Sequence, residues 1–370
     1  QNYKHKNLNF NDYKKLNINP NLRKSKFDYP IDDKNSDISI ANFNGVGGSS
    51  VLYSAHLPRF LPEDFENKKY NYIDSKWPLS YKKLKKYYDK NEKIFGIAGL
   101  PGDVSYPDFI KNLLPPVKLG KAVCKLAIAF EKLGWHWWPS YSGVITKRVD
   151  YRKLGTIIEP NNSYWPKALK NKVKLYTETK VLKIISTKDK VTCIEYLDQK
   201  KKLKRKYAKI IILACSGIGT PRLLLNSKNK FFPKGLANFS GLVGKNLMLH
   251  PLAWIEGKFS KFLNSQNGPQ GCSIYSTQFK KNKKFFKGYT IQVLREAHPV
   301  ENFVMRKKLN QLKFGKNFFK HFFEYFGKTI SAAVICEDLP YNSNKILLDY
   351  KNLDIDGMPG VKIFYKISKN

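Results

Sequence analysis

The sequence has few cysteines, and none of them form a pair with metal-ligand spacing. The five cysteines are odd in number and widely separated, at positions 124, 193, 215, 272 and 336. The sequence therefore supports neither a secreted disulfide framework nor a cysteine-based zinc site. Cys193 and Cys215 lie inside apolar runs, where a buried, reduced thiol is the expected state. This pattern predicts a reducing compartment, and we expect a cytoplasmic protein.

Long hydrophobic runs are also missing. A membrane-spanning helix needs roughly 18 to 20 apolar residues, and the longest clean run, Ile210 to Cys215 with its neighbours, is much shorter. We therefore expect no transmembrane segment. With 370 residues, of which 42% are hydrophobic, the chain is nevertheless long enough for a large core and one or two domains.

Acidic residues are scarce, since 29 Asp and Glu stand against 67 Lys and Arg and give a formal net charge of +38. Such a surplus is typical of polyanion-binding proteins. However, only eight of the basic residues are arginine, whereas nucleic-acid surfaces rely on the bidentate guanidinium. The lysines are also spread along the whole chain. We interpret the charge as a compositional bias and expect no nucleic-acid partner; a basic polyanion-binding protein is one alternative.

Helical patterns occupy the first half of the chain. Ser80 is a good N-cap and Gly96 a good C-terminal stop, which predicts a helix between them. Apolar residues at helical spacing predict a second helix over 117–133, with Gly134 after it. The aromatic cluster at 135–138 is expected to be core or pocket wall.

Short β-branched runs dominate the middle and the end of the chain. The basic run Lys200 to Lys206 lies between two of them and is expected to be a solvated hairpin tip. The runs after position 252 alternate in polarity and predict an antiparallel second domain. The predicted strands cover 173–176, 181–185, 191–196, 209–214, 288–294 and 329–336.

Two glycine-containing segments are candidates for binding a ligand. The loop 45–51 would let backbone approach a flat or charged group, although it can also be an ordinary tight turn. In the segment 215–225, Thr220 suits an N-cap and Pro221 the first helical position. A strand, a glycine turn and a helix N-terminus would form a cradle for a pyrophosphate. The alternative is a plain crossover, since Arg222 replaces the third glycine of a dinucleotide fingerprint.

Read together, these and other segments resemble the glucose-methanol-choline (GMC) family of FAD-dependent oxidoreductases. The resemblance spans about Asn44 to Ser368 and rests on the order and spacing of the motifs. Small departures from the family pattern occur at Tyr53, Gly217 and Lys228. The segments that carry the resemblance are Gly45–Val51 with Pro58–Phe65, Trp77–Tyr81 with Tyr87–Asp89, Ala214–Ser227, Gly241–Pro251, and Glu337–Asp349 followed by Asp354–Pro359.

The resemblance implies a two-domain α/β fold. It pairs an FAD-binding, Rossmann-like parallel sheet, incomplete at its N-terminus, with an antiparallel-sheet substrate domain. Residues 1–55, with the flavin loop, and 171–250 would form the FAD-binding domain, 56–170 a helical cap and 251–370 the substrate-binding domain. Family members begin with a G-x-G-x-x-G segment and end with a catalytic His, and neither is found here. We therefore expect an inactive internal fragment whose catalytic His lies beyond Asn370.

The resemblance also implies the chemistry. A base would take the hydroxyl proton of an alcohol, polyol or sugar while a hydride passes from carbon to FAD, and the electron acceptor is left open. His250 would be structural or close to the cofactor. A different two-domain flavoprotein, of the amine oxidase or hydroxylase type, is the other alternative. The cofactor-binding residues implied are Gly47, Gly48, Ser49, Ser50, Tyr53 and Ser54 at the isoalloxazine ring, Val181 at the adenine, and Ser216 and Gly217 at the ribose and pyrophosphate.

Overall fold

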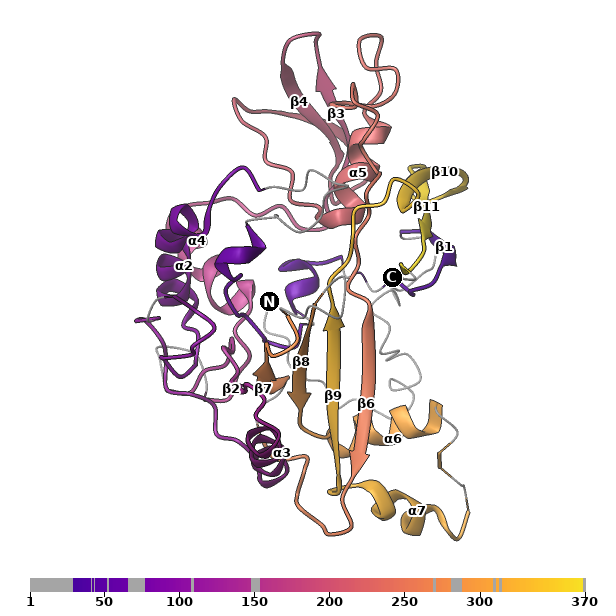
Figure 1. Ribbon diagram of the computed structural model, residues 1–370. Helices are drawn as coiled ribbons and strands as arrows, with labels where there is room; N and C mark the ends of the chain where they lie inside the picture. The colour runs from indigo at the N-terminus through magenta and orange to yellow at the C-terminus, as the bar shows by residue number, and fades with distance from the viewer. Residues whose placement is uncertain are drawn as a thin grey trace. The chain divides into compact units, whose positions relative to one another are not determined.

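The computed structural model describes residues 29–40, 42, 44–51, 53–65, 77–107, 110–147, 154–268, 271–280, 288–308, 311–312 and 315–368. Packing divides the chain into two compact units. The first unit combines Gln1–Ser49, Lys174–Leu249 and Asp338–Asn370, and the second combines Ser50–Val173 and His250–Glu337. Figure 1 labels most of the elements that are described below for each unit separately.

The division differs from the predicted one at two places. The segment 338–370 belongs to the first unit, because its strands pair with a strand near residue 31, whereas we expected it in the antiparallel domain. The predicted cap, 56–170, is not separate, because all of it lies in the second unit with the antiparallel sheet. Pairing between strands far apart in the sequence therefore determines the division.

The first unit contains two three-stranded sheets. One has the order β1-β11-β10, with a parallel pair β1–β11 and an antiparallel pair β10–β11. The other, β3-β4-β5, is antiparallel throughout. The strands are β1 Ile31–Ser36, β3 Lys180–Ser186, β4 Val191–Leu197, β5 Leu203–Tyr207, β10 Lys345–Leu353 and β11 Pro359–Tyr365. Parallel and antiparallel pairing with helices confirms the mixed α/β class.

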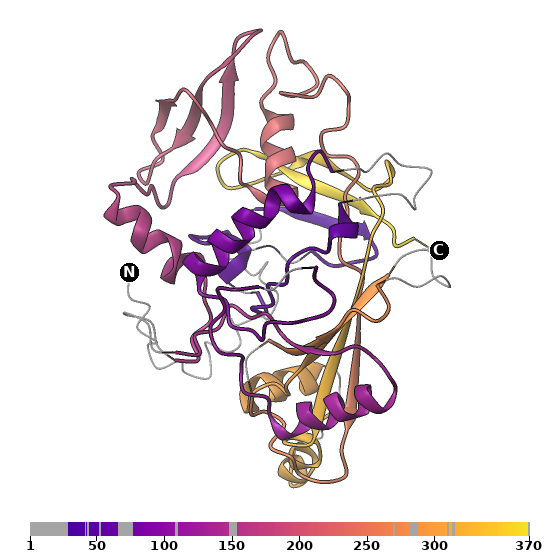
Figure 2. The ribbon, with the colours of Figure 1, turned by 60° about the vertical axis from the view of Figure 1, so that its left-hand side comes forward.

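Helix α5, Ser216–Asn226, packs against both of these sheets. On one face Ile218 joins a buried cluster with Ile346 and Val361. On the other face Leu223 packs with Ile184 of β3 in a second cluster. Figure 2 shows α5 beside the β10 and β11 strands. One helix therefore holds the two sheets in a single unit.

Three predictions in this unit need correction. The run 173–176 forms no strand, and neither does 209–214, because neither pairs with a neighbouring strand among the described residues. Ile210 and Ile212 are 80% and 84% exposed, so the apolar pattern alone does not produce a strand. Of the basic run, positions 200–202 form the hairpin turn as expected, but the remainder belongs to strand β5. The strands predicted over 181–185 and 191–196 are confirmed as β3 and β4.

The second unit is built on one five-stranded sheet with the order β2-β7-β8-β9-β6, and every pair in it is antiparallel. This confirms the predicted antiparallel sheet. The strands are β2 Trp138–Pro139, β6 Leu252–Lys258, β7 Cys272–Ser276, β8 Tyr289–Leu294 and β9 Thr329–Cys336. The helices are α2 Tyr81–Phe95, α3 Lys121–Lys132, α4 Tyr164–Lys170, α6 Pro299–Lys308 and α7 Phe318–Tyr325, with 3-10 turns η2 Pro62–Asp64 and η3 Pro160–Asn162. A further 3-10 turn, η1 Gly48–Val51, begins in the first unit and ends in the second.

The helix ends follow from their capping residues. The Ser80 side chain accepts a hydrogen bond from the Lys83 N–H, and Gly96 ends α2 with φ +81°, as predicted. Helix α3 begins at Lys121 rather than at 117, with Gly120 as its N-cap. Its inner face packs onto the sheet through a cluster that includes Val123 and Ile274. In the described part of the chain, no helix is long and apolar enough to cross a membrane.

Candidate cofactor site

The glycine loop has a backbone that favours glycine. Gly47 and Gly48 have φ of +94° and +60°, in the left-handed region that side chains disfavour. The Gly48 N–H donates to the Gly45 carbonyl over 2.9 Å and closes the turn. A Cβ atom at Gly48 would meet no heavy atom within 4 Å. The loop therefore leaves open space beside its backbone, as a planar ring would require.

The chain passes from the first unit to the second within this loop, between Ser49 and Ser50. Gly47, Gly48 and Ser49 belong to the first unit, and Ser50, Tyr53 and Ser54 to the second. The six loop residues named from the sequence are thus divided between two separately packed parts of the protein.

Tyr53 and Ser54 are fixed by contacts inside the second unit. The Tyr53 hydroxyl donates to the carbonyl of Ile158, so this side chain already has a structural partner. The start of β7 lies against Ser54, because a Cβ at Gly271 would lie 1.7 Å from the Ser54 carbonyl oxygen. The Gly143 N–H donates to the carbonyl of Ala55 over 2.7 Å. This arm of the loop is therefore rigidly anchored.

The start of α5 is open to an anion. The helix begins at Ser216, whose φ is +63°, and Cys215 provides no side-chain cap. Its first turn contains no acidic residue. Ser216 and Gly217 are exposed, and a Cβ at Gly217 would meet nothing within 4 Å. Free N–H groups at a helix N-terminus bind phosphates, so this end of α5 fits the diphosphate of FAD.

Our prediction for the capping of this helix was wrong. Thr220 is not its N-cap and Pro221 not its first residue, since both lie inside a helix that begins at Ser216. Pro221 has no N–H to donate to the preceding turn. Ile218 is buried in the core, and the segment that was expected to form a glycine turn is therefore part of the helix. The N-terminus of the helix therefore lies four residues earlier than Thr220.

Val181 lies in β3, opposite Tyr196 of β4. Its side chain packs at the edge of the cluster that joins β3 to α5. The Asn226 side chain donates to the Leu182 carbonyl over 3.0 Å and ties the end of α5 to β3. Val181, Ser216 and Gly217 therefore share one packed body. Contact between Val181 and adenine stays a prediction.

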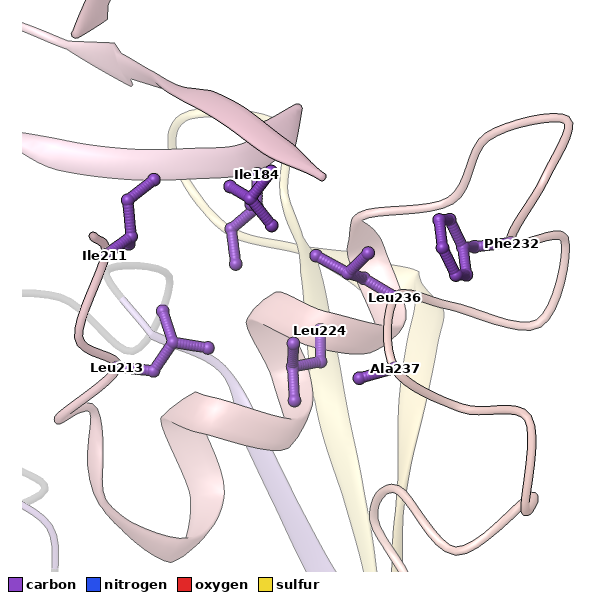
Figure 3. Close-up of a pocket in the computed structure, with 8 residues that line it drawn as sticks. Ile184, Ile211, Leu213, Leu224, Phe232, Leu236 and Ala237 are labelled. Carbon is purple, nitrogen blue, oxygen red and sulfur yellow. The ribbon is translucent and has the colours of Figure 1, made fainter. Parts of the chain in front are cut away.

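An apolar pocket of about 350 Å³ lies beside these elements. Figure 3 shows Ile211 and Leu213 from the segment before α5, with Leu224 from the helix itself. No polar side chain lines the pocket, so it offers no hydrogen bonds to a phosphate or ribose. The pocket was not predicted, because residues 209–214 were expected to form a strand. The lining residues are Ile184, Val191, Ile211, Leu213, Leu224, Phe232, Leu236 and Ala237.

A polar cluster in the second unit was also missed. His136 Nε2 lies 3.0 Å from Asp103 Oδ1, and the Thr277 N–H points at His136 Nδ1 over 3.1 Å. Because Nδ1 accepts this bond, the ring proton is on Nε2 and is donated to Asp103. The Tyr275 hydroxyl donates to the other carboxylate oxygen of Asp103. Burial alone would raise the pKa of Asp103, but the bonds from His136 and Tyr275 outweigh burial and lower it.

Neither His56 nor His250 is placed to act as a catalytic base. His56 Nδ1 lies 2.7 Å from the Ser140 hydroxyl, and its ring centroid lies 5.3 Å from that of Tyr275. Burial lowers the pKa of His56 from 6.5 to about 4, so this ring is neutral at neutral pH. His250 is exposed, and no described residue forms a hydrogen bond with its side chain. Nothing in the structure positions His250 as a base.

Solved structures establish the class of fold. The chain resembles the pyridoxine 4-oxidase of Mesorbium loti with a TM-score of 0.58, at 14% identity over 93% of this chain and 67% of that chain. It also resembles the formate oxidase of Aspergillus oryzae with a TM-score of 0.57, at 12% identity over 93% of this chain and 68% of that chain. The protein therefore has the two-part fold of these oxidases.

Sequence comparison identifies the family. The GMC oxidoreductase family model matches residues 140–252. The 2-methyl-1,2-propanediol dehydrogenase of Mycolicibacterium austroafricanum is 34% identical over 95% of this chain and 67% of that protein. The large subunit of fructose dehydrogenase from Gluconobacter japonicus is 29% identical over 56% of this chain and 41% of that protein. The chain belongs to the GMC oxidoreductase family. It is an FAD-dependent oxidoreductase that acts on CH–OH groups, and the predicted family and cofactor are confirmed.

Proposed function

We propose that the complete protein is a dehydrogenase that oxidises the primary hydroxyl of a small diol. The observation that carries this proposal is the 34% identity to a diol dehydrogenase over 95% of the chain. The fructose dehydrogenase subunit, at 29% identity, is also named a dehydrogenase, whereas two relatives named oxidases are 22% and 23% identical. We therefore propose an electron acceptor other than oxygen.

The residues of this chain would bind and orient the cofactor. When bound, FAD supplies the hydride acceptor. The exposed N–H groups at the start of α5 would bind its diphosphate, since no acidic residue competes there. The open backbone at Gly48 would leave room for the ring system. A cytoplasmic location, which the reduced cysteines favour, is part of this proposal.

The test is an assay of the full-length protein with an artificial dye under anaerobic conditions. We expect turnover of 2-methyl-1,2-propanediol and 1,2-propanediol, which carry C–H bonds beside a hydroxyl. tert-Butanol is the matched control, because its carbinol carbon has no hydrogen to transfer. Turnover of sugars but not diols would overturn the substrate proposal. Formation of hydrogen peroxide at the rate of substrate oxidation in air would overturn the proposed acceptor.

A further inference from the structure

Arg295 is a buried arginine with unused hydrogen-bonding capacity. It directly follows strand β8 and is only 9% exposed. Its Nη1 donates to the carbonyl of Glu296 over 2.7 Å. Its Nε–H is buried without an acceptor, and no described residue accepts a hydrogen bond from Nη2. The Nε–Nη2 edge of this guanidinium therefore has no acceptor among the described residues.

In two other buried arginines of this chain, the Nε and Nη2 atoms both donate hydrogen bonds to side-chain acceptors. Arg59 donates from Nε and Nη2 to the two carboxylate oxygens of Glu92, each over 2.6 Å. Arg306, in the same unit as Arg295, donates from Nε to Asn302 and from Nη2 to Glu256. A planar guanidinium edge matches the two oxygens of a carboxylate. Arg295 presents the geometry that Arg59 uses, but without the carboxylate.

The neighbouring acids do not fill this edge. The Glu296 carboxylate accepts hydrogen bonds from Ser265, Asn302 and the Gly327 N–H, which occupy both of its oxygens. Glu301 attracts Arg295 electrostatically, but its carboxylate accepts from the His298 N–H and forms no ion pair with Arg295. Both acids are thus engaged by other groups.

A glycine lies beside the base of the Arg295 side chain. A Cβ at Gly268 would lie 3.9 Å from Arg295 Cβ and 3.5 Å from the Gly120 nitrogen. Gly268 therefore adds no side chain next to Arg295. Helix α3, which follows Gly120, has no acidic residue in its first turn. Burial lowers the pKa of Arg295, and the electrostatic attraction of Glu301 does not offset this effect.

From these observations we propose that Arg295 is the anchor of a carboxylate-binding site in the second unit. The ligand is a small carboxylate whose two oxygens accept from Nε and Nη2. Its binding would supply the hydrogen bonds that the buried guanidinium lacks, and leaving such a group unsatisfied is costly. This site does not depend on the proposed diol substrate.

The test measures the melting temperature of the full-length, FAD-loaded protein with acetate, inorganic phosphate or chloride at constant ionic strength. We expect acetate to raise Tm by about 2 °C or more relative to chloride, because a ligand that binds only the native state stabilises it. Arg295→Met should abolish this rise, and Arg295→Lys should reduce it, because an ammonium lacks the planar edge. Arg205→Met, which removes an exposed arginine, is the matched control and should keep the full response.

The Tm of Arg295→Met in chloride shows whether this variant folds. Because Met removes a buried charge without an acceptor, Arg295→Met should be at least as stable as the wild type in chloride. Equal Tm values of the wild type in acetate and chloride would overturn the proposal. A response to acetate that Arg295→Met retains would also overturn it. A larger response to phosphate than to acetate would overturn the assignment to carboxylates.

Discussion

Arg222 donates from Nη2 to Asp354 over 2.6 Å and joins α5 to the turn between β10 and β11. Both side chains are almost completely buried. Arg222 Nε also donates to the Pro359 carbonyl, and the guanidinium lies over the Tyr29 ring at 4.3 Å. The arginine that replaces the third glycine of a dinucleotide fingerprint thus has a structural role. Its interactions hold the first unit together.

We expect Arg222→Met to destabilise the protein by about 3 kcal/mol, because removing one partner of a buried ion pair leaves the other charge uncompensated. Lys180, which lies 3.1 Å from Asp354, keeps the loss near the lower end of the usual range. Urea unfolding measures the loss. Arg205→Met removes an exposed pair with Glu195 and should cost much less than Arg222→Met, because solvent screens exposed ion pairs. Equal losses in the two variants would contradict the role of Arg222.

Gly48→Val should reduce the amount of FAD that the full-length protein binds. A branched residue at φ +60° is strained by about 1–3 kcal/mol, and its side chain would occupy the open space beside the loop. Gly134→Val is the matched control, because Gly134 has φ +64° and equally open surroundings after α3. Flavin absorbance per protein should fall only for Gly48→Val. Equal flavin content in both variants would argue against a ring beside this loop.

His56 should make the protein less stable in mild acid. Its pKa is about 4 in the native state and 6.5 ordinarily, so between these values the unfolded chain binds a proton that the native protein does not. The free energy of unfolding should therefore fall as pH drops from 6.5 to 4, by up to about 3 kcal/mol. Urea midpoints at pH 7 and 4.5 measure this loss. His56→Gln should lose less stability over the same range, and an unchanged loss would contradict the prediction.

Tyr275→Phe should cost more stability than Tyr141→Phe. The Tyr275 hydroxyl donates to the charged Asp103, and such bonds contribute about 1.5–3 kcal/mol. The Tyr141 hydroxyl donates over 3.2 Å to the neutral Leu100 carbonyl, which is worth about 0.5–1.5 kcal/mol. Both rings are buried, so the comparison isolates the hydroxyl. Unfolding of the two variants at pH 7 provides the measurement, and equal costs would contradict an ionised Asp103.

The sequence predicted those helices and strands whose structure depends on neighbouring residues in the chain. Helix α2 follows from Ser80 and Gly96, because both caps act within one turn of the chain. Strands β3 and β4 follow from their β-branched runs. The start of α5 did not follow from local residues, because burial of Ile218 against other segments decides it. The strand expected over 209–214 failed because a strand also needs a partner.

The candidate site could also be predicted from the sequence only in part. The glycines of the loop were recognisable from the sequence, since left-handed backbone and close approach both favour glycine. Asp103, His136 and Tyr275 come from segments far apart in the chain, and no local pattern connects them. The unfilled edge of Arg295 was equally invisible, because it depends on which groups Glu296 and Glu301 already bind.

The parallel pairing of β1 with β11 has a consequence for synthesis on the ribosome. These strands lie about 330 positions apart, so β1 is made long before its partner. At about 5–20 residues per second, β1 waits on the order of 20–60 s for β11. The second unit completes its sheet with β9, about 30 residues earlier than the first. Among the described strands, β1 therefore has no partner until β11 is made, and an exposed strand edge of this kind promotes aggregation during synthesis.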